Sequence, residues 1–246
     1  MTVTKILDIL NGIAPVDTAC AWDNCGLLAG NTNAEVTGVY VTLDADLYAL
    51  ERAKQNGCNL VVSHHPVIFD AMKSVTDTDV VFEYITNGVA VISMHTCLDI
   101  ARGGVNDALA NAIGLTDIQP VFLDGEPLAR IGDTGAKDTD EFIDICKRAT
   151  DSERADCVLI NAVKRVMTVS GSGGSALDTA KALGADTLVT GEAKHSDFVK
   201  AHNIGINLIT LGHFETENLI IPTLCEIISG YVKTVADDRK QIVTRR

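Results

Sequence analysis

The feature that most restricts the fold of this 246-residue chain is an internal similarity between its two halves. The stretch ALERAKQNGCNLVVSHH (residues 49–65) aligns without gaps with ALDTAKALGADTLVTGE (residues 176–192), and each combines a helix, a helix-ending glycine and a strand. The segments that follow, NGVAVISMHTCLD and IGINLITLGHFETE, align as well, with their histidines one place out of register. We interpret the similarity as an internal duplication. The alternative is that any two β/α units share apolar runs and glycines.

Strand-like and helix-like segments alternate along both halves. The first half has GVYVTLD, ADLYALERAKQNG, NLVVSHH, VVFEYITNG and VAVISMH, and the second has RVMTVSG, SALDTAKALG, DTLVTGE, DFVKAHNIG and INLITLGH. This alternation predicts an α/β protein of two similar lobes, each with a largely parallel sheet flanked by helices. We expect the lobes to span residues 1–124 and 125–246, with the Gly- and Asp-rich stretch DGEPLARIGDTGAKDTDEF at the boundary.

Composition excludes several classes of protein. Hydrophobic residues make up 46% of the chain, which is enough for a buried core, and no apolar stretch is long enough to span a membrane. A net charge of −13 disfavours binding to nucleic acid or to an anionic membrane. Seven cysteines without a CxxC pair, and an N-terminus without the features of a signal peptide, predict a cytoplasmic protein without a disulfide framework.

Four of the six histidines fall at the ends of expected strands. His64 and His65 end NLVVSHH, His95 follows VAVISM, and His213 follows INLITLG. Ligand sites in open α/β sheets lie at the carboxyl ends of the strands, so these side chains are candidates for a binding site. For any one of them alone, the alternative is a hydrogen-bonded structural histidine.

Two carboxylates follow these histidines at the same spacing. Asp99 comes four residues after His95, and Glu217 comes four residues after His213. If a helix begins at each histidine, this spacing places imidazole and carboxylate on one face. Imidazoles combined with carboxylates favour Zn, Mn, Fe or Ni over Ca and Mg, which prefer oxygen ligands. The pattern predicts a site for one or two such ions, dinuclear if a carboxylate bridges them.

Two loops are candidates for contacts with a substrate. In SGSGGS, the backbone around Ser172 and Gly173 could hold an anionic group, and the alternative is a plain tight turn. The stretch GEAKH places Glu192, Lys194 and His195 at another strand end, either as acid/base groups or as solvated loop residues.

The chain resembles the Nif-three-like family, also known as dinuclear-metal type 2 GTP cyclohydrolases. The resemblance rests on five motifs that occur in order: WDNCGLLAG, VVSHHPVIF, HTCLDIARGGVNDALA, SGSGGSALDTAKALGADTLVTGEAKH and ITLGHFETE. It implies a duplicated α/β fold, toroidal homohexamers assembled from dimers or trimers, and a site for two divalent ions, which we expect between the lobes. Many relatives carry a long central insertion, which this chain lacks.

The same resemblance implies five metal ligands, namely the HHP pair, the aspartate of HTxxD and both ends of GHxxxE. In this chain they are His64, His65, Asp99, His213 and Glu217, with Glu217 as the bridging carboxylate. His95 resembles a neighbour of the metals rather than an assured ligand.

The resemblance further implies a metal-dependent hydrolase, most specifically a GTP cyclohydrolase-like enzyme that opens the purine imidazole ring with metal-activated water. His95 and His195 are the candidates for proton transfer. The candidates for holding the substrate are Ser172, Gly173, Lys194 and Arg102. One alternative is a metal storage, delivery or scaffold protein without GTP turnover, and another is a phosphoesterase. The expected partners are further copies of the chain and a small-molecule substrate that could be a nucleotide. We expect the chain to bind neither a nucleic acid nor a membrane.

Overall fold

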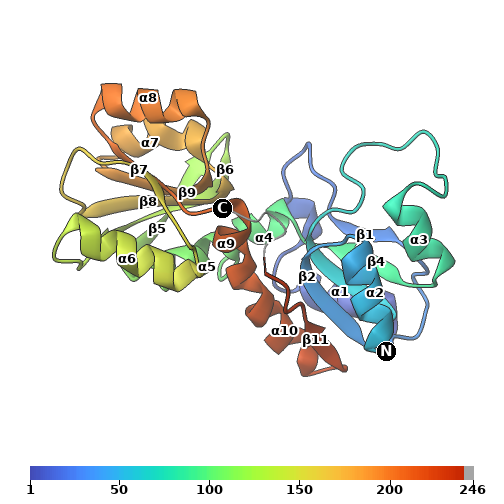
Figure 1. The fold of residues 1–246 in the computed structure, drawn as a ribbon. Coiled ribbons are helices and arrows are strands. Elements are labelled where there is room, and N and C mark those ends of the chain that lie inside the picture. The colour runs from blue at the N-terminus through green and yellow to red at the C-terminus, as the bar shows by residue number, and fades with distance from the viewer. Residues whose placement is uncertain (241–246) are drawn as a thin grey trace. The chain divides into compact units, whose positions relative to one another are not determined.

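The computed structural model of the chain describes residues 1–240. They form two compact units, one made of Met1–Arg102 with residues 220–240, and the other of Gly103–Leu219. Each unit is an α/β structure with a single central sheet (Figure 1). The expected fold class is therefore confirmed.

The first unit contains a five-stranded sheet in the order β1-β4-β3-β2-β11. Neighbouring strands are parallel except at the edge, where β1 runs antiparallel to β4. The strands are β1 (Gly26–Ala29), β2 (Val39–Asp44), β3 (Leu60–His65), β4 (Ala90–Ser93) and β11 (Thr234–Ala236). The helices are α1 (Val3–Asn11), η1 (Val16–Thr18), α2 (Leu47–Gln55), α3 (Val80–Thr86), α4 (Thr96–Ile100) and α10 (Ile221–Ser229).

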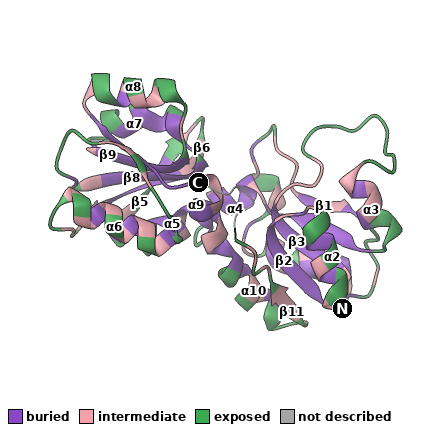
Figure 2. Cartoon of the chain, viewed as in Figure 1, coloured by how far each residue is buried: buried purple, intermediate pink, exposed green. Residues whose placement is uncertain are grey.

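The central strands of the first unit, β2 and β3, lie in its core (Figure 2). The first five residues of β2, VYVTL, are all buried, as expected for a parallel strand with helices on its faces. Tyr40 and Val61 pack in one cluster with Ala49 of α2 and Val81 of α3. Asp46 fixes the start of α2, because its side chain accepts a hydrogen bond from the Ala49 backbone N–H.

The second unit contains a six-stranded sheet in the order β5-β6-β8-β9-β10-β7. Strands β8, β9 and β10 are parallel, and the other neighbours are antiparallel. The strands are β5 (Leu115–Leu123), β6 (Glu126–Thr134), β7 (Asp156–Val158), β8 (Arg165–Ser172), β9 (Thr187–Glu192) and β10 (Asn207–Thr210). The helices are α5 (Val105–Ala112), α6 (Thr139–Thr150), η2 (Gly174–Ala176), α7 (Leu177–Ala182), α8 (His195–Ile204), α9 (His213–Glu217) and η3 (Asn218–Ile220).

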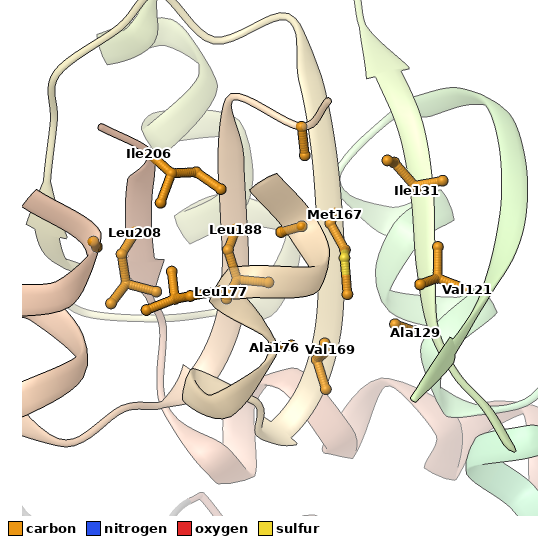
Figure 3. Close-up of a cluster of buried hydrophobic side chains, with 13 residues drawn as sticks. Val121, Ala129, Ile131, Met167, Val169, Ala176, Leu177, Leu188, Ile206 and Leu208 are labelled. Carbon is orange, nitrogen blue, oxygen red and sulfur yellow. The ribbon is translucent and has the colours of Figure 1, made fainter. Parts of the chain in front are cut away.

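The core of the second unit lies on both faces of this sheet. Leu188 and Leu208 pack with residues of α7 on one face (Figure 3). The next residue of each strand, Val189 or Ile209, packs with Phe142 of α6 on the other face. Successive residues of a strand point to opposite faces, so the apolar runs of β9 and β10 supply both cores.

The same succession of elements occurs in both units, in accord with an internal duplication. Strands β2, β3 and β4 are parallel and adjacent in the first unit, as β8, β9 and β10 are in the second. An antiparallel edge strand follows in each sheet, β1 beside β4 and β7 beside β10. The positions of β3 and β9 coincide with the similar stretches found in the sequence.

The division into units differs from the boundary expected after residue 124. The stretch DGEPLARIGDTGAKDTDEF is not a linker, because most of it forms β6 and the start of α6. Ala129 and Ile131 are buried, and β6 joins β5 to β8 in the second sheet. Residues 103–124 therefore belong to the second unit, while residues 220–240 complete the first. Residues 241–246 of the expected second lobe lie outside the described residues.

Two expectations drawn from composition concern the chain as a whole. None of the helices formed by residues 1–240 has the length and apolar character needed to cross a bilayer. All seven cysteines lie in the same range, and none of them forms a disulfide.

Candidate metal centre

Three histidines come together at the carboxyl edge of the first sheet. His64 and His65 are the last residues of β3, and His95 immediately precedes α4, just beyond the end of β4. Because β3 and β4 are adjacent and parallel, their ends meet at one edge. The ring centroids lie 5.0 to 5.6 Å apart, and each ring offers one nitrogen within 4.8 Å of the others.

The Nδ1 atoms of the adjacent pair are held by fixed acceptors. His64 Nδ1 lies 2.9 Å from the backbone carbonyl of Met94, and His65 Nδ1 lies 2.8 Å from Asp44 Oδ1. A carbonyl oxygen can only accept, so His64 carries its proton on Nδ1, and the Asp44 carboxylate favours the same tautomer for His65. This tautomer places the lone pair of each neutral ring on Nε2, as in metal-binding histidines.

His95 is oriented in the same way by Asp23. Nδ1 of His95 lies 2.8 Å from Asp23 Oδ1, and the other oxygen of Asp23 accepts hydrogen bonds from the Thr96 backbone N–H and hydroxyl. Burial of Asp23 raises its pKa, but the hydrogen bonds from His95 and Thr96 outweigh it and hold the pKa well below its ordinary value. Asp23 is therefore an ionised acceptor that keeps the His95 proton on Nδ1.

Asp99 is the remaining predicted ligand in this unit. It lies on α4 and is 8% exposed. Asp99 Oδ1 is 3.8 Å from His64 Nε2. The first unit thus combines imidazole nitrogens and a buried carboxylate at one edge of its sheet.

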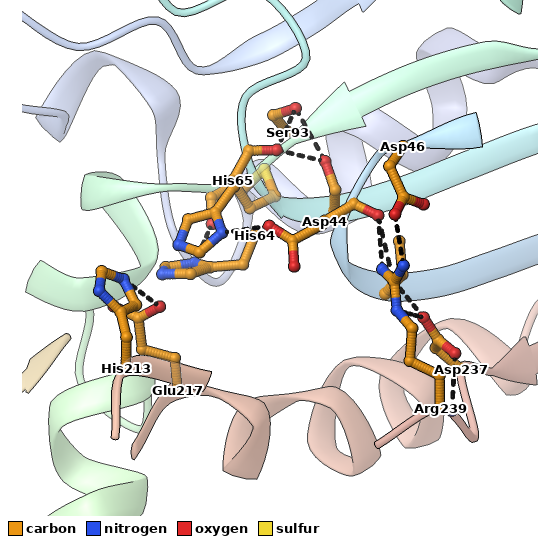
Figure 4. A network of polar contacts seen from close by, with 12 residues as sticks. Asp44, Asp46, His64, His65, Ser93, His213, Glu217, Asp237 and Arg239 are labelled. Carbon is orange, nitrogen blue, oxygen red and sulfur yellow. Dashed lines mark hydrogen bonds and ion pairs between the residues drawn. The ribbon is translucent and has the colours of Figure 1, made fainter. Parts of the chain in front are cut away.

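The C-terminal segment holds the end of β2, where Asp44 lies (Figure 4). Arg239 Nη2 donates to the backbone carbonyl of Asp44 at 3.1 Å, and Nη1 pairs with Asp46. The same guanidinium pairs with Asp237 through Nε at 3.0 Å and lies 5.1 Å from the ring centroid of Tyr48. These contacts fix the backbone that positions Asp44 against His65.

We expect Asp44→Asn to weaken metal binding by about 10–100-fold, the usual effect of removing a carboxylate that supports a metal-binding histidine. The amide has the same size, but it lacks the charge that makes His65 Nε2 more basic. Competition with a chromophoric chelator measures the affinity. Asp77→Asn, in an exposed loop, is the matched control and should leave the affinity unchanged. Equal affinities in the two variants would contradict the role assigned to Asp44.

The second unit presents a histidine and a carboxylate together on α9. His213 Nε2 lies 3.1 Å from Glu217 Oε2, so the expected i, i+4 pairing is confirmed (Figure 4). His213 Nδ1 lies 3.2 Å from Glu192 Oε2 at the end of β9. Glu217 is 5% exposed, while Glu192 is exposed.

The absence of a side chain at Gly171 leaves room for His213 and Glu217. The pairing of β8 with β9 is irregular between Val169 and Ser172, and Gly171 has a φ of 60° there. A methyl group on Gly171 would collide with Glu217 Oε1 and lie 3.1 Å from His213 Nε2. A side chain at this position would therefore fill the place of the imidazole and the carboxylate.

A cavity of about 520 Å³ lies in the second unit. Its walls include two predicted substrate residues, Ser172 and Lys194, together with Glu192. Arg154 and Asp156 also line it, and they pair with each other at 3.1 Å. The strand-end rule could not predict Arg154 as a residue of this cavity, because Arg154 lies in the loop before β7.

Three other predicted residues do not line this cavity within the described part of the chain. Gly173 donates its backbone N–H to the Thr190 hydroxyl at 2.8 Å, so this N–H is already engaged and is not an anion donor. His195 is exposed at the start of α8. Arg102 is exposed in the turn after α4.

The donor set fits borderline divalent ions. Imidazole nitrogens with anchored Nδ1 atoms and buried carboxylates suit Zn, Mn, Fe or Ni. The chain is thus an α/β protein whose first unit has three histidines that could hold a metal ion, and whose second unit presents His213 beside Glu217.

The chain belongs to the Duf34/NIF3 (NGG1p interacting factor 3) family, whose match covers residues 1–243. It is 27% identical to a GTP cyclohydrolase 1 type 2 homolog of Clostridium perfringens, over 100% of this chain and 97% of that protein. It is 32% identical to the protein of the same name from Lactococcus lactis, over 78% of this chain and 79% of the relative. The crystal structure of Staphylococcus aureus protein SA1388 superposes with a TM-score of 0.90 at 24% identity, over 100% and 99% of the two chains. The expected family is confirmed.

Proposed function

We propose that the chain is a divalent-metal-dependent hydrolase, and most specifically that it opens the imidazole ring of a purine nucleotide such as GTP. The observation that carries the proposal is the group formed by His64, His65 and His95, in which the Nδ1 of each ring is held by a fixed acceptor. The names of the relatives support the reaction class.

The proposed cofactors are two divalent ions per chain, from among Zn, Mn, Fe and Ni. When bound, such ions lower the pKa of water toward neutrality and polarise the group under attack. The ligands that we assign are, from the first unit, His64, His65 and Asp99 and, from the second unit, His213 and Glu217.

His95 is the residue that we assign to proton transfer. The ionised Asp23 holds its Nδ1–H, so Nε2 carries the lone pair that accepts a proton from water. A neutral imidazole suits this role because one ring nitrogen can accept a proton while the other keeps its hydrogen bond. His195 remains a second proposal for the proton donor to the opened ring.

Lys194 and Ser172 are the residues that we assign to the anionic part of the substrate. Both line the cavity of the second unit. Lys194 has no salt bridge among the described contacts, whereas Arg154 is paired with Asp156. Arg102, exposed in the turn after α4, is a further candidate for this contact.

Formate release from GTP tests the reaction. Wild-type protein reconstituted with each metal should release formate, and a protein that carries both His64→Ala and Glu217→Ala should not. His202→Ala, which removes an exposed histidine of α8, is the matched control and should keep wild-type turnover.

Turnover no greater in the wild type than in the double variant would exclude the GTP reaction. A parallel screen of phosphate esters would then identify a phosphoesterase. Transfer of the metal to a competing apo-enzyme, without turnover of any substrate, would identify a delivery protein.

We propose further that the protein works in the cytoplasm as a homohexamer. The location rests on the cysteines, none of which is in a disulfide among the described residues. The hexamer rests on the family resemblance, and the mass of the protein in solution tests it.

A further inference from the structure

Two large aromatic side chains are exposed beside the histidines of the first unit. Trp22 is 62% exposed and Phe69 is 52% exposed, although aromatic residues make up only 4% of the chain. Their ring centroids lie 6.0 Å apart, and both rings meet His95 edge-on, at 6.1 and 6.2 Å. Trp22 and Phe69 are called the aromatic platform below.

The loops that carry the aromatic platform are fixed by their neighbours. Asp23, next to Trp22, is bound to His95 and Thr96. Asn24 donates its side-chain N–H to the backbone carbonyl of Ile68 at 2.7 Å and so ties the two loops together. Trp22 thus presents its ring, Asp23 orients the His95 imidazole, and Asn24 joins the two loops. The aromatic platform is therefore preorganised.

We propose that the aromatic platform binds the planar nitrogen heteroaromatic ring of the substrate, a nucleobase, by stacking. The proposal rests on the proposed function and names the part of the substrate that lies at the histidines. A base on this platform would lie next to His95, the residue assigned to proton transfer.

The negative charge around the aromatic platform favours binding of a base over binding of a phosphate group. Asp23 is ionised, and the chain carries a net charge of −13. Aromatic faces bind bases of any charge state, because stacking does not depend on a cationic partner.

Trp22 is the only tryptophan of the chain, so its fluorescence reports on this place alone. The full-length protein is titrated with guanosine, GTP and ribose 5-phosphate, with excitation at the red edge of the tryptophan band. We expect saturable quenching by guanosine and by GTP, and none by ribose 5-phosphate. The titrations are run with metal-depleted and with metal-loaded protein.

Three variants sharpen the test. Phe69→Ala should weaken guanosine binding by about tenfold to a hundredfold, the usual effect of losing a stacking partner. Phe69→Tyr keeps an aromatic face and should bind like the wild type. Phe122→Ala is the matched control, because Phe122 lies on β5 of the second unit and is 63% exposed.

Equal guanosine affinities in Phe69→Ala and the wild type, or no saturable quenching at all, would overturn the proposal. A change of particle mass in Phe69→Ala without quenching would overturn it too, since the platform would then contact a second copy of the chain. Saturable quenching without turnover of any substrate would support base binding at the aromatic platform and exclude the proposed reaction. Turnover with the same KM in Phe69→Ala and the wild type would support the reaction and exclude a role of the aromatic platform in substrate binding.

Discussion

Protein carrying His64→Ala should retain almost none of the divalent metal that the wild type holds. His64 is fully buried, and its ring centroid lies 5.0 Å from that of His65 and 5.2 Å from that of His95. Alanine removes Nε2 together with the ring that the Met94 carbonyl holds through Nδ1. The imidazoles of His65 and His95 cannot move into the gap without breaking their own hydrogen bonds to Asp44 and Asp23. Elemental mass spectrometry after reconstitution measures the loss, from near two equivalents per chain in the wild type.

Two further variants make this result interpretable. Glu217→Gln keeps the shape of its side chain and should also lose metal, which separates coordination from any damage caused by the cavity at position 64. His202→Ala should keep the wild-type content, because His202 is an exposed residue of α8. Full metal content in both His64→Ala and Glu217→Gln would show that these side chains are structural.

The histidine group was predictable from the sequence because of a rule about parallel strands. His64 and His65 end a strand-like run, and His95 follows another. Neighbouring parallel strands end at one edge, so the sequence alone places these side chains together. The i, i+4 spacing likewise predicts the contact of His213 with Glu217.

The residues that orient the histidines were missed, for two different reasons. Asp44 ends β2, which pairs with β3, so the strand-end rule applied to GVYVTLD could have found it. Asp23 precedes β1, an antiparallel edge strand, and no periodicity brings it to His95. Only its place in the motif WDNCGLLAG marked it in the sequence.

The boundary between the units was misplaced because residues that favour turns can also occur within a strand. The stretch DGEPLARIGDTGAKDTDEF is rich in residues that favour turns, yet the four consecutive residues 129–132 are buried in a strand. The hairpin of β5 and β6 has no counterpart in the first unit, so the internal similarity carried no signal for it.

Replacing Gly171 by alanine should reduce metal binding by at least about 10–100-fold, as expected when a ligand loses its correct orientation. The added methyl group would occupy the place of Glu217 Oε1 and press on His213 Nε2. The backbone cannot relieve this contact easily, because the Gly171 N–H donates to the Thr216 hydroxyl and its carbonyl accepts from Thr190. The Glu217 carboxylate is therefore expected to move away from His213.

Gly184→Ala is the matched control for this substitution. Gly184 also has a positive φ, 78°, but a methyl group there meets no atom within 4 Å. Both variants should lose about 1–2 kcal/mol of stability through backbone strain, since alanine disfavours left-handed conformations. Chemical denaturation measures that common loss, and chelator competition measures the affinity. Equal metal affinities in the two variants would mean that the approach of α9 to β8 at Gly171 has no role in metal binding. A loss confined to Gly171→Ala would assign the pair of His213 and Glu217 to metal binding, without any change to either side chain.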